Sequence, residues 1–124
     1  MKNNQNTDLA TIVDDHPLAI IYFSQPNCSI CLADKPRVKK LAETYTLPFY
    51  TINVLDAPAI AANFSVMTVP VVLLVLKGKE VHREARIIDF RRFEKQIQRY
   101  RSASTSDLDS ISYADLFDQL DERQ

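Results

Sequence analysis

Apolar and polar positions along the chain alternate in blocks whose periods predict strands and helices in turn. The apolar run Leu18–Ser24 predicts a strand with both faces covered, and the mixed stretch after it predicts a helix ending near Tyr45. Residues 49–54 alternate and predict the next parallel strand. Residues 57–64 predict a short helix, with Asp56 as its N-cap and a proline in the first turn. The first half of the chain therefore predicts the order strand, helix, strand, helix.

The next stretch predicts a β-hairpin and a long helix. Pro70 opens a strand, a position that proline tolerates, and Gly78 in the following turn supplies a positive φ. Residues 81–88 predict the antiparallel partner strand, and Asp89 caps a last helix. Apolar residues form one stripe of that helix and basic residues the opposite face. The stripe is Phe90, Phe93, Ile97 and Tyr100, and the basic face is Arg91, Arg92, Lys95, Arg99 and Arg101.

Both ends of the chain differ from this central part. Thr7 caps a predicted short helix over residues 8–14. Residues 1–102 carry 14 Lys and Arg against 10 Asp and Glu, a net charge of +4, whereas residues 103–124 carry one against six, a net charge of −5. We predict a domain over residues 1–102 and a linker with an acidic amphipathic tail over residues 103–124. The tail is expected to dock onto the basic domain, either of the same chain or of a neighbour in a homodimer, and the alternative is a disordered tail. The apolar tail residues are Leu108, Ile111, Leu116, Phe117 and Leu120.

Length and composition exclude several classes of function. The 124 residues suffice for one domain with its own core, and a net charge of −1 gives no reason to expect a nucleic-acid or membrane partner. The longest uncharged apolar run, Val69–Leu76, has eight residues, far fewer than the roughly twenty that span a bilayer. The polar first residues predict no signal peptide, so we expect a cytoplasmic protein, in a compartment where thiols are mostly reduced.

Both cysteines lie in Cys28-Ser29-Ile30-Cys31, between the first strand and its helix. Residues three apart on a first helical turn share a face, at a separation that suits a disulfide. The N–H groups of the helix start stabilise a thiolate, which favours an exposed Cys28 as nucleophile and a more buried Cys31. Two alternatives are a pair of small buried residues and half of a zinc site. The only histidines, His16 and His82, lack a metal-like spacing, so we predict redox chemistry and no metal.

A second stretch, Thr68-Val69-Pro70 ahead of the predicted hairpin, completes a family pattern with the cysteines. Together with Pro36, five residues after Cys31, it resembles the thioredoxin superfamily over about residues 7–101. The resemblance implies an α/β fold, with a four-stranded mixed sheet and helices on both faces. It also implies a cis Val69–Pro70 bond facing the cysteines, and it makes Asn27, Thr68, Val69 and Pro70 the substrate-binding residues.

The resemblance further implies a thiol–disulfide oxidoreductase that acts on protein disulfides. Cys28 would attack the substrate, Cys31 would resolve the mixed disulfide, and Val69 would pair with the substrate backbone. No cofactor is implied at the site. Reducing equivalents would come from another protein or a small thiol, which the sequence does not name.

Four departures from the family pattern set this chain apart from a general thioredoxin. The family has Trp-Cys-Gly-Pro-Cys where this chain has Asn27-Cys28-Ser29-Ile30-Cys31, and Tyr22 stands at the place of a buried aspartate. Thr51 replaces the lysine that accompanies this aspartate, and Arg86 replaces a glycine near the substrate. We expect a narrower set of partners. The alternative is a protein-binding module of the same fold without significant redox turnover.

Overall fold

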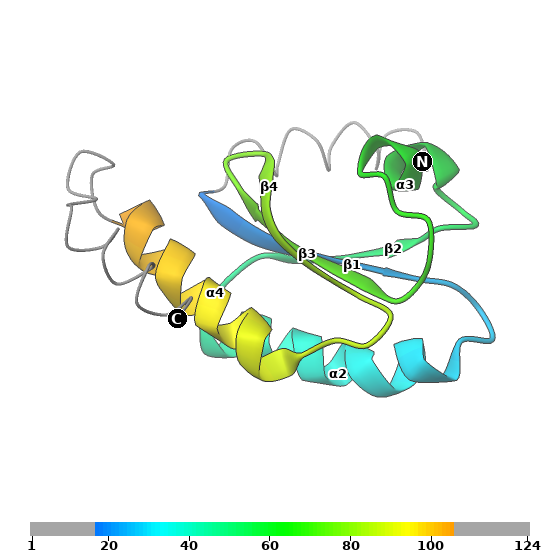
Figure 1. Ribbon diagram of the computed structural model, residues 1–124, viewed down its shortest axis with the longest axis horizontal. Coiled ribbons are helices and arrows are strands. Elements are labelled where there is room, and N and C mark those ends of the chain that lie inside the picture. The colour runs from blue at the N-terminus through cyan, green and yellow to red at the C-terminus, as the bar shows by residue number, and fades with distance from the viewer. Residues whose placement is uncertain (1–16, 106–124) are drawn as a thin grey trace.

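The computed structural model describes residues 17–105, which form a four-stranded sheet with helices on both faces (Figure 1). The strand order is β2-β1-β3-β4; β1 pairs with β2 in parallel, and the other two pairs are antiparallel. The predicted thioredoxin-like α/β fold with a mixed sheet is confirmed. In chain order the elements are β1 (Leu18–Ser24), α2 (Ser29–Thr44), β2 (Phe49–Asn53), α3 (Pro58–Asn63), β3 (Val71–Leu76), β4 (Lys79–Ala85) and α4 (Phe90–Thr105).

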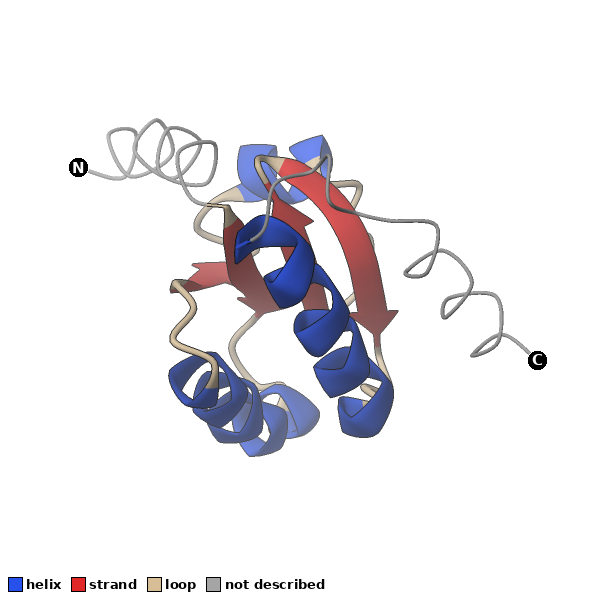
Figure 2. Cartoon of the chain, turned by 90° about the vertical axis from the view of Figure 1, so that its left-hand side faces the viewer, coloured by secondary structure: helices blue, strands red, loops and turns tan. Residues whose placement is uncertain are grey.

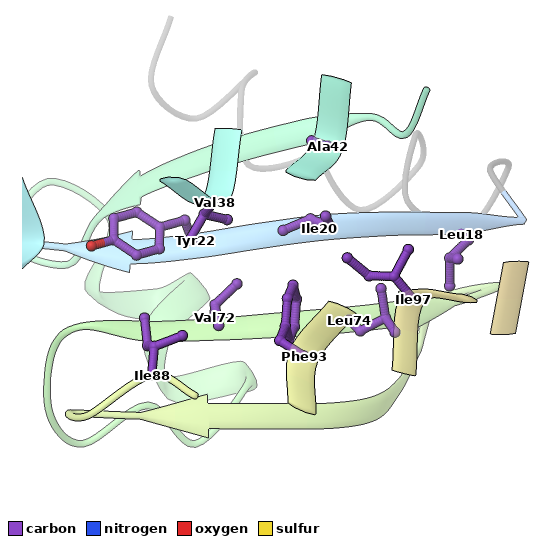
Figure 3. Close-up of a cluster of buried hydrophobic side chains, with 10 residues drawn as sticks. All are labelled: Leu18, Ile20, Tyr22, Val38, Ala42, Val72, Leu74, Ile88, Phe93 and Ile97. Carbon is purple, nitrogen blue, oxygen red and sulfur yellow. The ribbon is translucent and has the colours of Figure 1, made fainter. Parts of the chain in front are cut away.

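The core has two halves, one on each face of the sheet. Helices α2 and α4 cover one face and α3 covers the other (Figures 1 and 2). Residues of the two central strands are buried on both faces, which explains their continuous apolar runs. The α2/α4 half contains Leu18, Ile20, Tyr22, Val38, Ala42, Val72, Leu74, Ile88, Phe93 and Ile97 (Figure 3), and the α3 half is built around Ile21, Phe23, Ile60, Leu73 and Val75.

The register of the strands brings four chain segments to one edge of the sheet. Phe23 pairs with Val71, so β1 ends where β3 begins, and Val71 also pairs with Ala85 at the end of β4. The Val54 N–H donates to the carbonyl of Ser24 (2.9 Å), which places the end of β2 there as well. We call this edge the CxxC edge, because the chain runs from β1 through residues 25–27 directly into the cysteines.

The hairpin between β3 and β4 has the expected turn. Gly78 has a φ of 82° and Lys77 a φ of 51°. Two central residues with positive φ belong to the turn that best matches the twist of paired strands, and glycine tolerates that conformation without a steric cost. The hairpin lies at the opposite end of β3 from the CxxC edge.

Two predicted details near the CxxC edge are wrong. Asp56 does not cap α3: the N-cap is Ala57, whose side chain can accept no hydrogen bond, and the helix starts at Pro58. Strand β4 ends at Ala85 instead of continuing to Ile88. The reason is that Arg86 adopts a positive φ of 66° and donates its N–H to the carbonyl of Pro70 (2.7 Å), which turns the chain out of the strand.

The two long helices also differ in detail from the prediction. Leu32 is 74% exposed, because the buried face of α2 passes through Cys31, Val38 and Ala42 instead. Helix α4 continues to Thr105, so the first residues of the expected linker are helical. The Ser102 hydroxyl donates to the Gln98 carbonyl one turn earlier (3.2 Å), a bond that serine makes readily within a helix. Asp89 caps α4 as predicted, by accepting the Arg92 N–H at 3.0 Å.

Other predictions lie outside the described residues. These are the helix over residues 8–14, the acidic tail beyond Thr105 and a homodimer through that tail. Within residues 17–105, no helix is long and apolar enough to cross a membrane.

Glu84 is the one acidic residue buried in the described core, at 3% exposure. Its carboxylate accepts two hydrogen bonds from Arg92 (2.6 and 2.7 Å) and one from the Asp89 N–H (3.3 Å), and His82 Nε2 lies 2.6 Å away. Burial raises the pKa of Glu84, but the bonds from Arg92, His82 and Asp89 together outweigh burial and leave the pKa below its usual value. This cluster joins β4 to the start of α4.

Replacing Glu84 by glutamine should therefore lower the free energy of unfolding at pH 7 by roughly 1.5–3 kcal/mol, because the ion pair with Arg92 is lost and the amide NH2 group cannot accept the second of the two Arg92 bonds. Since the folded pKa lies below the unfolded value of 4.5, the stabilisation is complete above pH 4.5. The difference between variant and wild type should then shrink as the pH falls through the folded pKa. Urea denaturation across pH measures both effects.

The matched control is Glu80→Gln. Glu80 is exposed and pairs with Arg83 (2.7 Å), so its loss should change stability by no more than about 1 kcal/mol. If both variants lose the same free energy of unfolding, or if the loss in Glu84→Gln does not change with pH, the buried cluster does not stabilise the fold as described.

Candidate active site

The two cysteines form a disulfide at the start of α2. Their Cα atoms lie 5.2 Å apart, within the range that a disulfide requires. Cys28 is the N-cap residue of the helix, and its Sγ accepts the Cys31 N–H at 3.2 Å. Cys31 is 3% exposed, whereas Cys28 is half-buried. The predicted contrast between an accessible first cysteine and a buried second one is confirmed.

The position of Cys28 has an electrostatic consequence. The first N–H groups of a helix lack intrahelical partners and carry the positive end of the helix dipole. The Cys28 sulfur already accepts one of these groups, so a thiolate formed on reduction lies where this field is strongest. No acidic residue lies in the first turn of α2 to oppose it. The geometry therefore favours Cys28 over Cys31 as the ionised thiol.

Tyr22 occupies the interior directly behind the cysteines. Its side chain is fully buried at the carboxyl end of β1 (Figure 3), and its hydroxyl donates to the Cys31 carbonyl at 2.8 Å. Burial, and secondly the charge of Asp34, raise the pKa of Tyr22 to about 12. The phenol therefore stays protonated at neutral pH. It can hold the first turn of α2 against β1, but it cannot take a proton from Cys31.

The segment before β3 lies at the same edge. The Val69–Pro70 peptide bond is cis, as predicted, and Pro70 is buried. Within residues 17–105 neither the N–H nor the C=O of Val69 has a hydrogen-bond partner. Unpaired backbone groups of this kind can accept an added strand.

A hollow of about 320 Å³ lies beside this segment. Gln25 lines it from the loop before the cysteines, and Thr68 and Val69 line it from the other side. Its remaining lining residues are Val54, Val66 and Met67. The shared hollow shows that the segment 66–69 lies next to the loop that leads into Cys28.

Exposed apolar residues gather in the segments that meet at the CxxC edge. Ile30 and Leu32 start α2, Leu55 follows β2, Met67 precedes the cis bond and Ile87 follows β4. Their exposures run from 55% for Ile30 to 93% for Met67. Large apolar side chains gathered on one exposed part of a protein mark a site for another molecule. All the large apolar residues that are strongly exposed in the described part of the chain lie in these segments.

The structure brings most of the predicted site residues to this one edge. Asn27 is exposed, with a φ of 64°, directly before Cys28, and Thr68 is exposed beside the half-buried Val69. Thr51 is the neighbour of Tyr22 in the sheet, on the exposed edge strand β2. Their roles toward a substrate remain predictions. The bond from Tyr22 to Cys31 was not predicted; a phenol in an apolar buried strand, which must find a partner, is the signal that could have indicated it.

Between residues 17 and 105, no three histidine, cysteine, aspartate or glutamate side chains gather in a way that could hold an ion. The two sulfur atoms of the site are bonded to each other.

Comparisons with known proteins give the family. The family model described as Thioredoxin matches residues 1–99. The thioredoxin-like protein YdfQ of Bacillus subtilis is 34% identical over 92 residues, covering 73% of this chain and 82% of YdfQ. Thioredoxin 1 of Thermosipho africanus is similar in structure, with a TM-score of 0.66 and 31% identity over 71% of this chain and 99% of that one. A mutant thioredoxin from Halobacterium salinarum has a TM-score of 0.70 and 26% identity, over 76% and 83%. The chain therefore belongs to the thioredoxin family, and its disulfide-forming cysteine pair supports thiol–disulfide oxidoreductase chemistry in general.

Proposed function

We propose that this protein is a cytosolic oxidoreductase that reduces disulfides of other proteins with its Cys28–Cys31 pair. The observation that carries the proposal is the disulfide at the start of α2, with Cys28 accessible and Cys31 buried behind it. The predicted cytosolic location supports the reducing direction, since thiols there are mostly reduced. Membership of the thioredoxin family supports the type of reaction.

The reaction begins with the reduced protein. The Cys28 thiolate attacks one sulfur of the substrate disulfide, a mixed disulfide forms, and the other substrate sulfur leaves as a thiolate. Cys31 loses its proton and attacks Cys28, which releases the second substrate thiol and closes the Cys28–Cys31 bond. Two electrons pass from the protein to the substrate, and each substrate thiolate takes up a proton. A protein or small-thiol reductant then restores the dithiol.

Tyr22 changes one step of this scheme. Among residues 17–105 no buried carboxylate lies behind the cysteines, so we expect the proton of Cys31 to leave through water or through the substrate. We expect this resolving step to be slower than with a dedicated base. Such a protein would serve a narrow set of partners that bind well at the CxxC edge.

The surface around the cysteines favours protein disulfides over small disulfides as substrates. An extended substrate segment can pair with the unpaired N–H and C=O of Val69, as an added strand pairs with a sheet edge. The exposed Met67 and Ile87 on the neighbouring segments then cover its apolar side chains. Thr68 and Asn27 supply polar groups on the same surface.

Insulin reduction tests the proposal. With dithiothreitol as reductant, the wild-type protein should accelerate precipitation of reduced insulin chains, and the Cys28→Ser variant should match the rate with dithiothreitol alone. Serine is a preferred N-cap residue, so the variant keeps the start of α2. If a correctly folded wild-type protein is as inactive as the variant, the chain is a protein-binding module whose cysteines are incidental.

A further inference from the structure

We propose that Arg86 selects substrates carrying an acidic residue beside the reactive disulfide. The inference rests on the proposed function and names the class of substrate that the CxxC edge prefers. It is carried by the place of Arg86 in the fold, by its backbone conformation and by the absence of a charge partner for it among residues 17–105.

Arg86 is fixed directly beside the residue that we expect to pair with substrate. Its N–H donates to the carbonyl of Pro70 at 2.7 Å, and Pro70 follows Val69. The next residue, Ile87, donates its own N–H to Ala85 (2.8 Å), so the chain turns tightly at Arg86. A substrate strand along Val69 would therefore run past the base of the Arg86 side chain.

The backbone of Arg86 adopts a conformation that favours glycine. Its φ is 66°, where a side chain with a Cβ atom is disfavoured. The bond to Pro70 holds this conformation in place and presents the Arg86 side chain to solvent. An arginine at such a position meets a steric penalty that a glycine would avoid, which is reason to ask what the guanidinium contacts.

Several other arginines of the described chain have a charge or ring partner, whereas Arg86, like Arg91, has none there. Arg83 pairs with Glu80, Arg92 pairs with Glu84, and the Arg37 guanidinium lies 3.8 Å from the centre of the Phe90 ring. No side chain among residues 17–105 forms an ion pair or hydrogen bond with the Arg86 guanidinium. As far as the described residues go, its cation is available to a ligand.

The surroundings of Arg86 define the ligand. Exposed apolar residues lie in the neighbouring segments, Ile87 at 85% exposure and Met67 at 93%. A substrate that covers these side chains also removes water from around the guanidinium, and attraction to a carboxylate then becomes stronger than in water. A basic substrate residue beside the guanidinium is repelled, so Arg86 favours acidic substrates and disfavours basic ones. The preferred ligand is a disulfide-bearing segment with Asp or Glu near its cysteine and apolar residues around them.

Single-turnover kinetics test this inference without an external reductant. Three peptides, each closed by one disulfide, carry Glu, Gln or Lys next to the cysteine and are otherwise identical. Full-length protein, reduced beforehand and freed of reductant, transfers two electrons to the peptide disulfide and is itself oxidised. At low salt the wild type should reduce the Glu peptide roughly three- to tenfold faster than the Lys peptide, as expected for one partly screened charge pair. High salt should shrink the ratio.

Variants of Arg86 test whether this side chain causes the preference for the Glu peptide over the Lys peptide. Arg86→Lys should keep it, Arg86→Asn should abolish it, and Arg86→Glu should invert it; asparagine tolerates the positive φ. Lys79→Glu is the matched control, because it makes the same change of charge on an exposed residue of the hairpin at the far end of β4. Its preference should equal that of the wild type. Circular dichroism and thermal melting confirm folding of each variant.

The outcomes separate this inference from the proposed function. Equal rates for the Glu and Lys peptides, or a preference that persists in all Arg86 variants, overturn the role of Arg86 while leaving the oxidoreductase intact. If the Arg86→Glu variant reduces all three peptides faster by the same factor, acidic residues of this chain itself occupy the site beside Arg86 in the wild type. That result also overturns the role of Arg86. If folded wild-type protein reduces no peptide at all, the proposed function fails and this inference fails with it.

Discussion

The Cys31→Ser variant should stop the reaction halfway and accumulate a covalent complex with its substrate. Cys28 is accessible at the start of α2 and can still attack, whereas no second thiol remains behind it to resolve the mixed disulfide. Mixed with an oxidised protein substrate, the variant should convert almost fully to an adduct that dithiothreitol releases. Intact-protein mass spectrometry and non-reducing electrophoresis measure the adduct.

The matched variant is Cys28→Ser, which should form no adduct under the same conditions. Its Cys31 is 3% exposed and lies behind the helix start, so a substrate disulfide cannot reach it. An adduct on Cys31 in this variant, with none on Cys28 in the other, would reverse the roles that the geometry assigns. Adducts on both would mean that burial of Cys31 does not protect it in the reduced protein.

The framework of the fold could be predicted because burial on two faces leaves a strong pattern. Strand β1 coincides with its apolar run, and the stripe of α4 places Phe93 and Ile97 in the core. The ends of elements could not be predicted with equal success, since contacts far along the chain decide them. Strand β4 ends at Ala85 because Arg86 bonds to Pro70, sixteen positions before it in the sequence.

The candidate site was predictable where its geometry is local. The separation of Cys28 and Cys31 follows from their spacing at a helix start, which the preceding strand already located. Contacts between different elements left no such local pattern. The bond from Tyr22 to the Cys31 carbonyl joins β1 to α2, and the exposure of Ile87 beside the buried Ile88 depends on how one loop turns at the edge of the sheet.

Tyr22 lies behind the cysteines, where a base could assist thiol–disulfide exchange, but it cannot act as a base itself. Its pKa of about 12 keeps the phenol protonated, so the hydroxyl positions the Cys31 carbonyl and does not accept the proton of the thiol. Tyr22→Phe should thus leave the rate of disulfide reduction unchanged. It should lower the free energy of unfolding by roughly 0.5–1.5 kcal/mol, the usual value of one neutral hydrogen bond.

Replacing Tyr22 by aspartate should have opposite effects on stability and on rate. Loss of the buried ring and burial of an unpaired carboxylate should together cost roughly 3–5 kcal/mol of folding free energy. A carboxylate in that place can take the proton of Cys31, so the resolving step should accelerate, by up to roughly 100-fold if proton transfer limits it. Tyr22→Asn is the matched control, because it leaves the same cavity without a base. Stopped-flow measurement of mixed-disulfide decay compares the two variants in conditions where both are folded. Equal decay rates for the aspartate and asparagine variants would show that proton transfer from Cys31 does not limit the reaction, and that Tyr22 acts on the fold alone.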